Sequence, residues 1–295
     1  MERRQFIQDS SLIAFSVGVF GQIKWNGTSY VGADPTTADI LGPLYRPGAP
    51  FKTNLIQAGT KGEILHFGGT IFGLNGKTPV EGALVEVWHC NEAGVYDNAS
   101  DDYVYRASFK TAANGKYQFK TILPVPYGGV GFTRPAHIHM RISGNSGTQD
   151  LVTQIYFKGD KYIDGDASAA DKRSLNRILG ISTNAKNEKV VKFDIYLRKE
   201  YLLDTASYKK IIGIYEMNDK SMVEFYHKSD QLFSKVNGQI MEAMDYKGNN
   251  RFESGLAQTI AQFDIQKEGV VKTTVSYLGA ENKMVSIEGV KSFKY

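Results

Sequence analysis

The residues best suited to chemistry in this chain are two histidines on one predicted strand. His137 and His139 lie two positions apart, shortly after Arg134. Because side chains alternate between the two faces of an extended strand, both imidazoles point to one side and Ile138 points to the other. Such a pair is half of a metal site. By itself it is more often a pair of surface histidines or of hydrogen-bonded core histidines, so ligation needs further support.

Two tyrosines upstream supply candidate ligands of an unusual type. Tyr96 lies in the turn-like segment 91–97, and Tyr127 lies in the Pro- and Gly-rich segment 124–129. A phenol has a pKa of about 10 and ionises at neutral pH only if a strong Lewis acid binds its oxygen, which favours Fe(III) over zinc or magnesium. No carboxylate accompanies the histidines, which argues against an Fe(II) site of two histidines and one carboxylate. The absence of a third histidine argues against a three-histidine zinc site.

Composition is that of an ordinary soluble globular protein. The chain has 295 residues, 42% hydrophobic and 22% charged, and this length favours about two domains. The net charge is +4, from 35 basic and 31 acidic residues that are scattered along the chain, so nucleic acid is not expected as a partner. The single cysteine, Cys90, cannot form an intramolecular disulfide, and we interpret it as a small buried hydrophobic residue.

Period-two patterns broken by glycine turns predict an all-β protein from about residue 60 onward. Strands are expected over 83–88, 137–143, 151–158 and 189–197. Asn114-Gly115 predicts a hairpin between strands at 106–111 and 116–123, because both central residues of a type I′ turn need positive φ. The segment 167–179 is the one plausible helix.

A domain boundary is predicted near residue 200. The polar segment 200–210 is interpreted as a linker, and 211–295 as a smaller antiparallel β domain with turns about every eight residues. Its rhythm resembles the small β-barrel appended to some serine-hydrolase-like proteins. It contains one histidine, His227, and no clustered acids, so we interpret it as a binding or packing module without chemistry of its own. We expect residues 1–204 to be active alone, unless this domain buries a sheet edge in a homo-oligomer.

The first residues resemble a twin-arginine export signal. Arg3 and Arg4 precede Phe6, and a short, mildly apolar run follows over 11–21. We therefore predict a signal over 1–21 and an exported or periplasmic protein. The alternative is that the two arginines begin an ordinary helix.

Several segments, in order, resemble the intradiol ring-cleavage dioxygenases, the family of catechol 1,2-, hydroxyquinol 1,2- and protocatechuate 3,4-dioxygenases. They are 42–50, 85–91 with 94–96, 115–127, 134–139 and 153–160. The resemblance implies a β-sandwich dioxygenase core, which we place over 30–199. It also implies Fe(III) as cofactor, a small aromatic diol and O2 as substrates, and ring cleavage between the hydroxylated carbons to a cis,cis-muconate-type product.

The resemblance assigns roles residue by residue. Tyr96, Tyr127, His137 and His139 match the four iron ligands of the family. Tyr127 matches the axial tyrosinate that leaves the metal when substrate binds and takes a proton from the catechol. Arg134 and Gln154 match the pair beside the substrate, where an arginine stabilises negative charge and an amide orients the ring. Candidate wall residues of the pocket are Leu44, Tyr45, Val80 and Val130.

Two other classes of function remain open at this point. A non-catalytic β-sandwich of the transthyretin or carboxypeptidase-regulatory type would explain the strands and glycine turns, but it would not require this ordered set of tyrosines and histidines. A carbohydrate- or polymer-binding protein, with the second domain as the functional part, is the other alternative.

Overall fold

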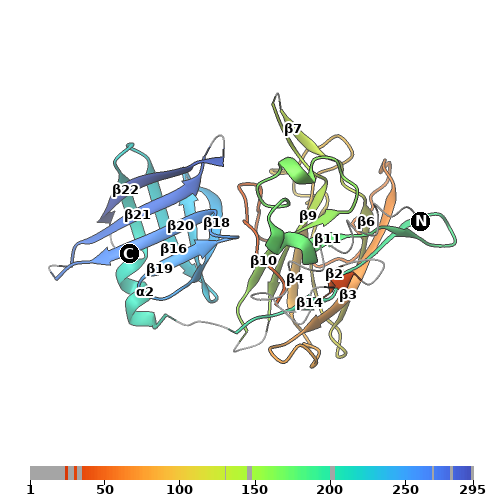
Figure 1. Cartoon of the computed structure of the whole chain (residues 1–295), viewed down its shortest axis with the longest axis horizontal. Helices are drawn as coiled ribbons and strands as arrows, with labels where there is room; N and C mark the ends of the chain where they lie inside the picture. The colour runs from red at the N-terminus through yellow and green to blue at the C-terminus, as the bar shows by residue number, and fades with distance from the viewer. Residues whose placement is uncertain are drawn as a thin grey trace, which may run out of the picture.

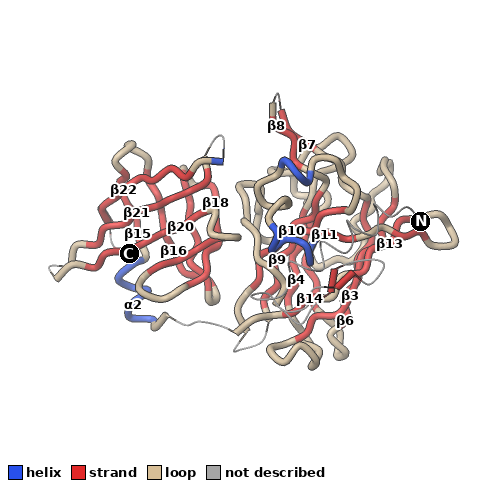
Figure 2. Tube along the Cα trace, viewed as in Figure 1, coloured by secondary structure: helices blue, strands red, loops and turns tan. Residues whose placement is uncertain are grey.

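The chain folds into two β domains joined in sequence near residue 200 (Figure 1). The computed structural model describes residues 24–25, 30–31, 35–129, 131–144, 148–199, 203–267, 269–279 and 282–293. The predicted signal over 1–21 lies outside the described residues. Strands dominate both domains and helices are few (Figure 2), so the all-β prediction is confirmed. No helix within the described ranges is both long and apolar enough to span a membrane.

The N-terminal domain is a sandwich of two sheets. One sheet has the order β11-β10-β9-β4-β5, and the other has the order β12-β13-β3-β14, with β6 also paired to β3. Two short hairpins, β1-β2 and β7-β8, lie outside these sheets. The strands are β1 (Lys24–Trp25), β2 (Tyr30–Val31), β3 (Ile64–Phe72), β4 (Leu84–Trp88), β5 (Arg106–Lys110), β6 (Lys116–Ile122), β7 (Tyr127–Gly129), β8 (Phe132–Arg134), β9 (His137–Ser143), β10 (Leu151–Phe157), β11 (Ile178–Leu179), β12 (Ser182–Thr183), β13 (Lys189–Lys192) and β14 (Ile195–Tyr196).

Strand β9 is buried on both faces. Ile138, Met140 and Ile142 point into the core between the sheets, as the period-two pattern predicts. The alternate residues, including His137 and His139, point to the outer face of the sheet and are also buried. Buried polar side chains need hydrogen-bond or metal partners, so this covered outer face is the candidate position of a functional site.

Three local predictions were wrong. Asn114-Gly115 does not close a hairpin, because β5 pairs with β4 and β6 pairs with β3, so the turn carries the chain from one sheet to the other. The sequence signal specifies the turn, but packing of the sandwich decides the pairing. The segment 167–179 contains no α-helix but one 3-10 helix, η2 (Lys172–Arg177), followed by β11, and a second 3-10 helix, η1 (Ile163–Gly165), lies just before it. The strand expected over 189–197 is interrupted at Phe193 and Asp194.

The C-terminal domain is a closed barrel of eight strands in sequential order. Aromatic and aliphatic side chains from all around the barrel, such as Tyr215, Phe225 and Phe263, fill its interior. The interior is therefore a packed core. Its strands are β15 (Gly213–Met217), β16 (Met222–Lys228), β17 (Gln231–Val236), β18 (Gln239–Tyr246), β19 (Arg251–Ser254), β20 (Thr259–Ile265), β21 (Val271–Leu278) and β22 (Met284–Phe293).

The predicted linker over 200–210 is shorter than expected. Helix α2 (Thr205–Ile211) begins at Asp204, whose side chain accepts a hydrogen bond from the Ser207 N–H. Tyr208 and Ile211 on this helix are buried in the barrel core. The helix therefore belongs to the barrel, because its apolar face is buried there.

Replacing Gly69 tests the close contact inside the second sheet. A Cβ at position 69 would lie 1.9 Å from the backbone oxygen of Phe193. Gly69→Ala must therefore push β3 away from the chain at Phe193, and we expect a loss of about 1–3 kcal/mol in the free energy of unfolding, measured by urea denaturation. Gly165→Ala is the control, since no atom lies within 4 Å of its added Cβ. Equal unfolding midpoints for the two variants would contradict this contact.

Candidate metal centre

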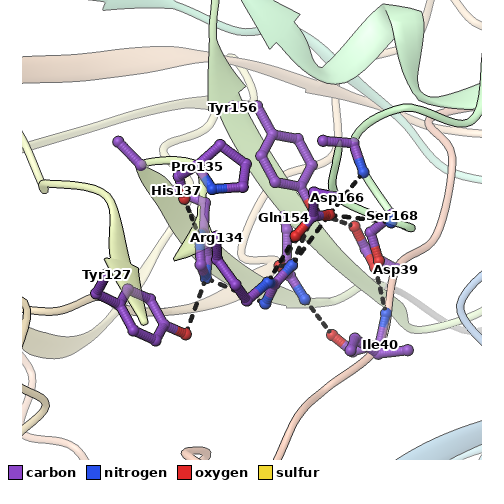
Figure 3. A network of polar contacts seen from close by, with 12 residues as sticks. Asp39, Ile40, Tyr127, Arg134, Pro135, His137, Gln154, Tyr156, Asp166 and Ser168 are labelled. Carbon is purple, nitrogen blue, oxygen red and sulfur yellow. Dashed lines mark hydrogen bonds and ion pairs between the residues drawn. The ribbon is translucent and has the colours of Figure 1, made fainter. Parts of the chain in front are cut away.

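Three of the four predicted ligands meet at one ring nitrogen. His137, at the start of β9, lies with its Nε2 3.3 Å from the Tyr96 hydroxyl and 3.5 Å from the Tyr127 hydroxyl. Tyr127 comes from β7, and Figure 3 shows its hydroxyl pointing at the His137 ring. Tyr96 and Tyr127 are in contact with each other, with ring centroids 5.4 Å apart. The structure thus brings together residues that are up to 41 positions apart in sequence.

His139 completes the group and has no hydrogen-bond partner. Its ring centroid lies 4.9 Å from that of His137, and it stacks on Trp88 at 4.8 Å. Both of its ring nitrogens are buried, and neither has a partner among the described residues. A neutral imidazole buried in this way forfeits two hydrogen bonds, which is costly unless another group, such as a metal ion, takes the free lone pair.

His89 shows what a structural histidine looks like in the same domain. Its Nδ1 lies 2.7 Å from the Cys90 oxygen, and its Nε2 lies 2.7 Å from the Thr121 hydroxyl. Both nitrogens are therefore satisfied. Cys90 itself is a buried free thiol in the adjacent apolar cluster, as predicted. The contrast between His89 and His139 separates a core histidine from a candidate ligand.

The protonation state of the histidines suits ligation. Burial, together with the nearby Arg134 charge, lowers the pKa of His137 to about 3. Burial, followed by the neighbouring His137, holds the pKa of His139 well below its ordinary value. His137 Nδ1 lies 2.6 Å from the backbone oxygen of Pro135, an acceptor only, so Nδ1 carries the proton. Nε2 is then the acceptor nitrogen, and its lone pair faces the two phenols and Arg134 Nη1.

A tight turn brings Tyr96 into the site. The Asn91 side chain accepts hydrogen bonds from the backbone N–H groups of Ala93 and Val95. Gly94 has a φ of +77°, and a Cβ there would lie 2.9 Å from Tyr127 Cβ. Glycine at this position therefore allows both the turn and the close approach of the two tyrosines. Burial raises the pKa of Tyr96 well above its ordinary value, so its phenolate forms only beside a strong Lewis acid.

Arg134 and Gln154 lie together at the edge of this group. Arg134 pairs with Tyr127 in the β7-β8 hairpin and donates from Nη2 to Gln154 Oε1 at 3.0 Å. Its Nη1 lies 3.4 Å from His137 Nε2. Figure 3 shows both side chains beside the Tyr127 and His137 rings. The two residues assigned to the substrate side are therefore neighbours of the candidate ligands.

Four residues that sequence reasoning missed hold this pair in place. The Asp166 carboxylate accepts from Arg134 Nε at 2.8 Å. The Tyr156 hydroxyl, which we expected only to pack within a strand, lies 3.2 Å from Gln154 Oε1 and donates to Asp39 Oδ2 at 2.9 Å. Arg177 forms a fully buried ion pair with Asp39. No local sequence pattern marks Asp166, because its partner Arg134 lies 32 positions away.

The predicted wall residues are only partly brought to the site. Leu44 packs against the apolar cluster that contains Trp88 and Tyr96. Tyr45 is buried, stacks edge-on against Trp88 and donates to Glu86. Val80 lies in the core between the sheets, so its assignment to the wall was wrong. Val130 lies outside the described residues.

Comparisons with known proteins agree with this geometry. The family described as Dioxygenase matches residues 40–199, more than half of the chain. The chain belongs to the intradiol dioxygenase family. The matched range ends before the barrel, so the barrel is an addition to the family core.

The chain matches its individual relatives over part of its own length and over part of theirs. A chlorocatechol 1,2-dioxygenase of Rhodococcus opacus is 34% identical, over 53% of this chain and 69% of the relative. Catechol 1,2-dioxygenase 2 of Acinetobacter lwoffii is 37% identical, over 49% of this chain and 58% of the relative. The solved catechol 1,2-dioxygenase of Pseudomonas arvilla C-1 is similar in fold, with a TM-score of 0.50 and 29% identity over 56% of this chain and 63% of that chain.

Removing Asp166 tests the support of Arg134. Asp166→Ala leaves the buried guanidinium without its carboxylate, and we expect a loss of about 3–5 kcal/mol in the free energy of unfolding at pH 7. Asp171→Ala, which breaks an exposed pair with Arg173, should cost about 1 kcal/mol or less. Urea denaturation of the dioxygenase measures both changes.

The pH dependence of this difference follows from the pKa of Asp166. Burial alone would raise that pKa, but the Arg134 charge and hydrogen bonds lower it below its ordinary value. The stability contributed by the Asp166–Arg134 ion pair is therefore complete above the ordinary aspartate range near pH 4. It is lost as the pH falls through the lower pKa that Asp166 has in the folded protein. A difference between Asp166→Ala and wild type that stayed constant down to pH 2 would contradict the ion pair.

Proposed function

We propose that this protein is an Fe(III)-dependent dioxygenase that cleaves a catechol-type diol between its hydroxylated carbons. The proposal rests on one observation: the Tyr96 and Tyr127 hydroxyls lie close to His137 Nε2. The adjacent His139 is buried, and neither of its ring nitrogens has a hydrogen-bond partner among the described residues. Family membership supports an enzyme over a non-catalytic sandwich or polymer-binding protein. The product is a cis,cis-muconate-type diacid that contains both atoms of O2.

The donor set fits ferric iron. Two imidazoles that are neutral through burial and two phenols that need a strong Lewis acid are the groups expected around Fe(III). Tyr96, Tyr127, His137 and His139 would hold the metal. Bound iron would supply the Lewis acidity and the redox chemistry by which the chelated diol reacts with O2.

The chain supplies the base and the charge around the diol. Tyr127 is the more exposed of the two tyrosines and sits on a two-stranded hairpin that is separate from the sheets of the sandwich. Its phenolate oxygen would accept a proton from one diol hydroxyl. The Arg134 guanidinium beside it favours the deprotonated diol, and its own orientation is held by Asp166. Gln154 fixes the position of the Arg134 fork through Oε1.

Substrate identity is proposed only as a class. Relatives are named for catechol, chlorocatechol and hydroxyquinol substrates. The apolar cluster next to the site contains Leu41, Trp88 and Tyr96, with Leu44 and Tyr127 packed against it. These side chains suit a small planar aromatic ring that carries two adjacent hydroxyls.

Loss of a ligand should remove iron. Tyr96→Phe and His137→Ala each delete one donor, so we expect both variants to lose most bound iron and the tyrosinate-to-iron absorption band of the wild type, measured by metal analysis and visible spectroscopy. Tyr105→Phe is a matched control, because Tyr105 stacks on His89 in the core. Wild-type iron content in both ligand variants would refute the assignment.

Tyr127→Phe should behave differently. Three donors remain, so we expect it to keep part of its iron while turnover of catechol falls by about 100-fold or more because the base is missing. Iron analysis and oxygen uptake distinguish the two effects. Equal iron loss in Tyr96→Phe, His137→Ala and Tyr127→Phe would contradict the special role of Tyr127.

We also propose that the protein is exported by the twin-arginine route, which carries folded cargo with its metal in place. Replacing Arg3 and Arg4 by lysine should then leave the protein in the cytoplasm of the expressing cell, detected by fractionation and immunoblot. Unchanged location of the variant would show that these arginines are not an export signal.

A further inference from the structure

One turn of the barrel touches the sandwich at two places. The turn between β19 and β20 covers Gly255–Gln258. A Cβ on Gly255 would lie 2.9 Å from the backbone nitrogen of Ile40, so the turn is in close contact with that segment. Gln258 Oε1 accepts from the Ser168 hydroxyl at 3.1 Å. The barrel and the dioxygenase core therefore meet through this turn.

The two places that the turn touches are those that hold Arg134 and Gln154. The Ile40 oxygen accepts from Gln154 Nε2 at 2.9 Å. Ser168 lies two residues after Asp166 and donates its backbone N–H to the Asp166 carboxylate at 3.0 Å, and the same carboxylate binds Arg134. Figure 3 shows Ile40 and Ser168 at the outer edge of this network. The turn is thus separated from Gln154 by Ile40 alone, and from Arg134 by Ser168 and Asp166.

Glu242 on β18 joins the turn to the same segment. Its carboxylate accepts from the hydroxyls of Ser254 and Thr259, the residues that flank the turn. The backbone of Leu41 also lies beside this carboxylate. Two residues further on, the Pro43 oxygen accepts from Gln239. The segment 39–43 therefore bonds to Gln154 on one side and to the barrel on the other.

Apolar packing closes the interface beside the metal ligands. Phe233 of β17 and Ala243 of β18 are buried in one cluster with Leu41, Trp88 and Tyr96. Trp88 stacks on His139 and Tyr96 is a proposed ligand. The barrel thus covers part of the outer face on which the site is built.

We propose that the C-terminal barrel is a positioning part of the active site, in which the Gly255–Gln258 turn and Glu242 set the places of Gln154 and Arg134 through Ile40 and the Asp166 loop. The inference deepens the proposed function and rests on it. It revises the expectation that residues 1–204 are active alone. Without the barrel, segment 39–43 loses the hydrogen bond from Gln239 and the contact with Glu242, and a shift of about 1 Å at a substrate-orienting group is enough to lower kcat/KM strongly.

The test compares two glycine variants of the full-length, iron-loaded protein. Gly255→Ala adds a methyl group against Ile40, whereas Gly248→Ala places the same group in another barrel turn with no atom within 4 Å. Both glycines have positive φ, +58° at Gly255 and +91° at Gly248, so alanine meets an unfavourable left-handed backbone conformation at either position. Gln258→Ala is a third variant, which removes the acceptor of Ser168 without added bulk.

The readouts are amide hydrogen exchange over residues 38–46 and 163–176, and KM and kcat for catechol. We expect Gly255→Ala and Gln258→Ala to exchange faster in these ranges than wild type and to raise KM about tenfold or more, with a smaller change in kcat. Gly248→Ala should match wild type in both. Unchanged exchange and KM in Gly255→Ala and Gln258→Ala, or an equal effect of Gly248→Ala, would overturn the proposal.

Failure of the proposed function gives a different result. If iron-loaded wild-type protein cleaves no catechol, the assigned reaction is wrong, while the exchange comparison still decides whether the barrel holds the two segments. If wild type is active and only the melting temperature responds to Gly255→Ala, the barrel is a structural addition without a positioning role.

Discussion

The structure depends on the burial of polar side chains on the outer face of β9. His137, His139 and Arg141 are each 2% exposed or less. Burial keeps the imidazoles neutral, as a ligand must be, and it obliges the arginine to find carboxylates. Arg141 pairs with Glu86 and Asp150, and these pairs are also buried. The covered face is therefore where metal chemistry is feasible, and it requires a dense set of partners.

Those partners come from distant parts of the chain, and their main effect is to fix the orientation of the charged side chains. Buried ion pairs seldom add much net stability, because desolvation offsets the attraction, but they restrict the orientation of the charged groups. Arg134 is held by Asp166 in this way, and Arg177 holds Asp39, which also accepts from Tyr156. Arg134 and Gln154 are thus oriented by a second layer of charged groups, and the loop 163–177 supplies two of these groups, Asp166 and Arg177.

The added barrel takes part in covering this face. Its core is filled by its own side chains, so its contribution to function lies on its outer surface, where Phe233 meets Leu41 and Trp88. The family match ends at residue 199, so this cover is a property of the present chain and not of the shared core. The core that matches the family and the barrel that lies outside that match meet at segment 39–43.

The amino-acid sequence by itself determined the features that are local. Alternation over 137–143 predicted that His137 and His139 share a face, and the all-β class followed from period-two runs and glycine turns. The four candidate ligands with Arg134 and Gln154 were also identified from ordered motifs, because each motif is a short segment whose residue types suit one chemistry. The structure places these six residues together.

Tertiary structure alone decided which partners complete the site. Asp166 and Tyr156 could not be assigned from sequence, because a carboxylate 32 positions from Arg134 becomes its partner only when the loop closes over the strand. The Asn114-Gly115 turn was recognised but its strand pairing was not, since a turn signal does not say which sheet each strand joins. The barrel looked separate because its internal pattern is complete by itself. Its contact with Ile40 forms between the surfaces of two folded domains, so the residue pattern of a single strand cannot predict it.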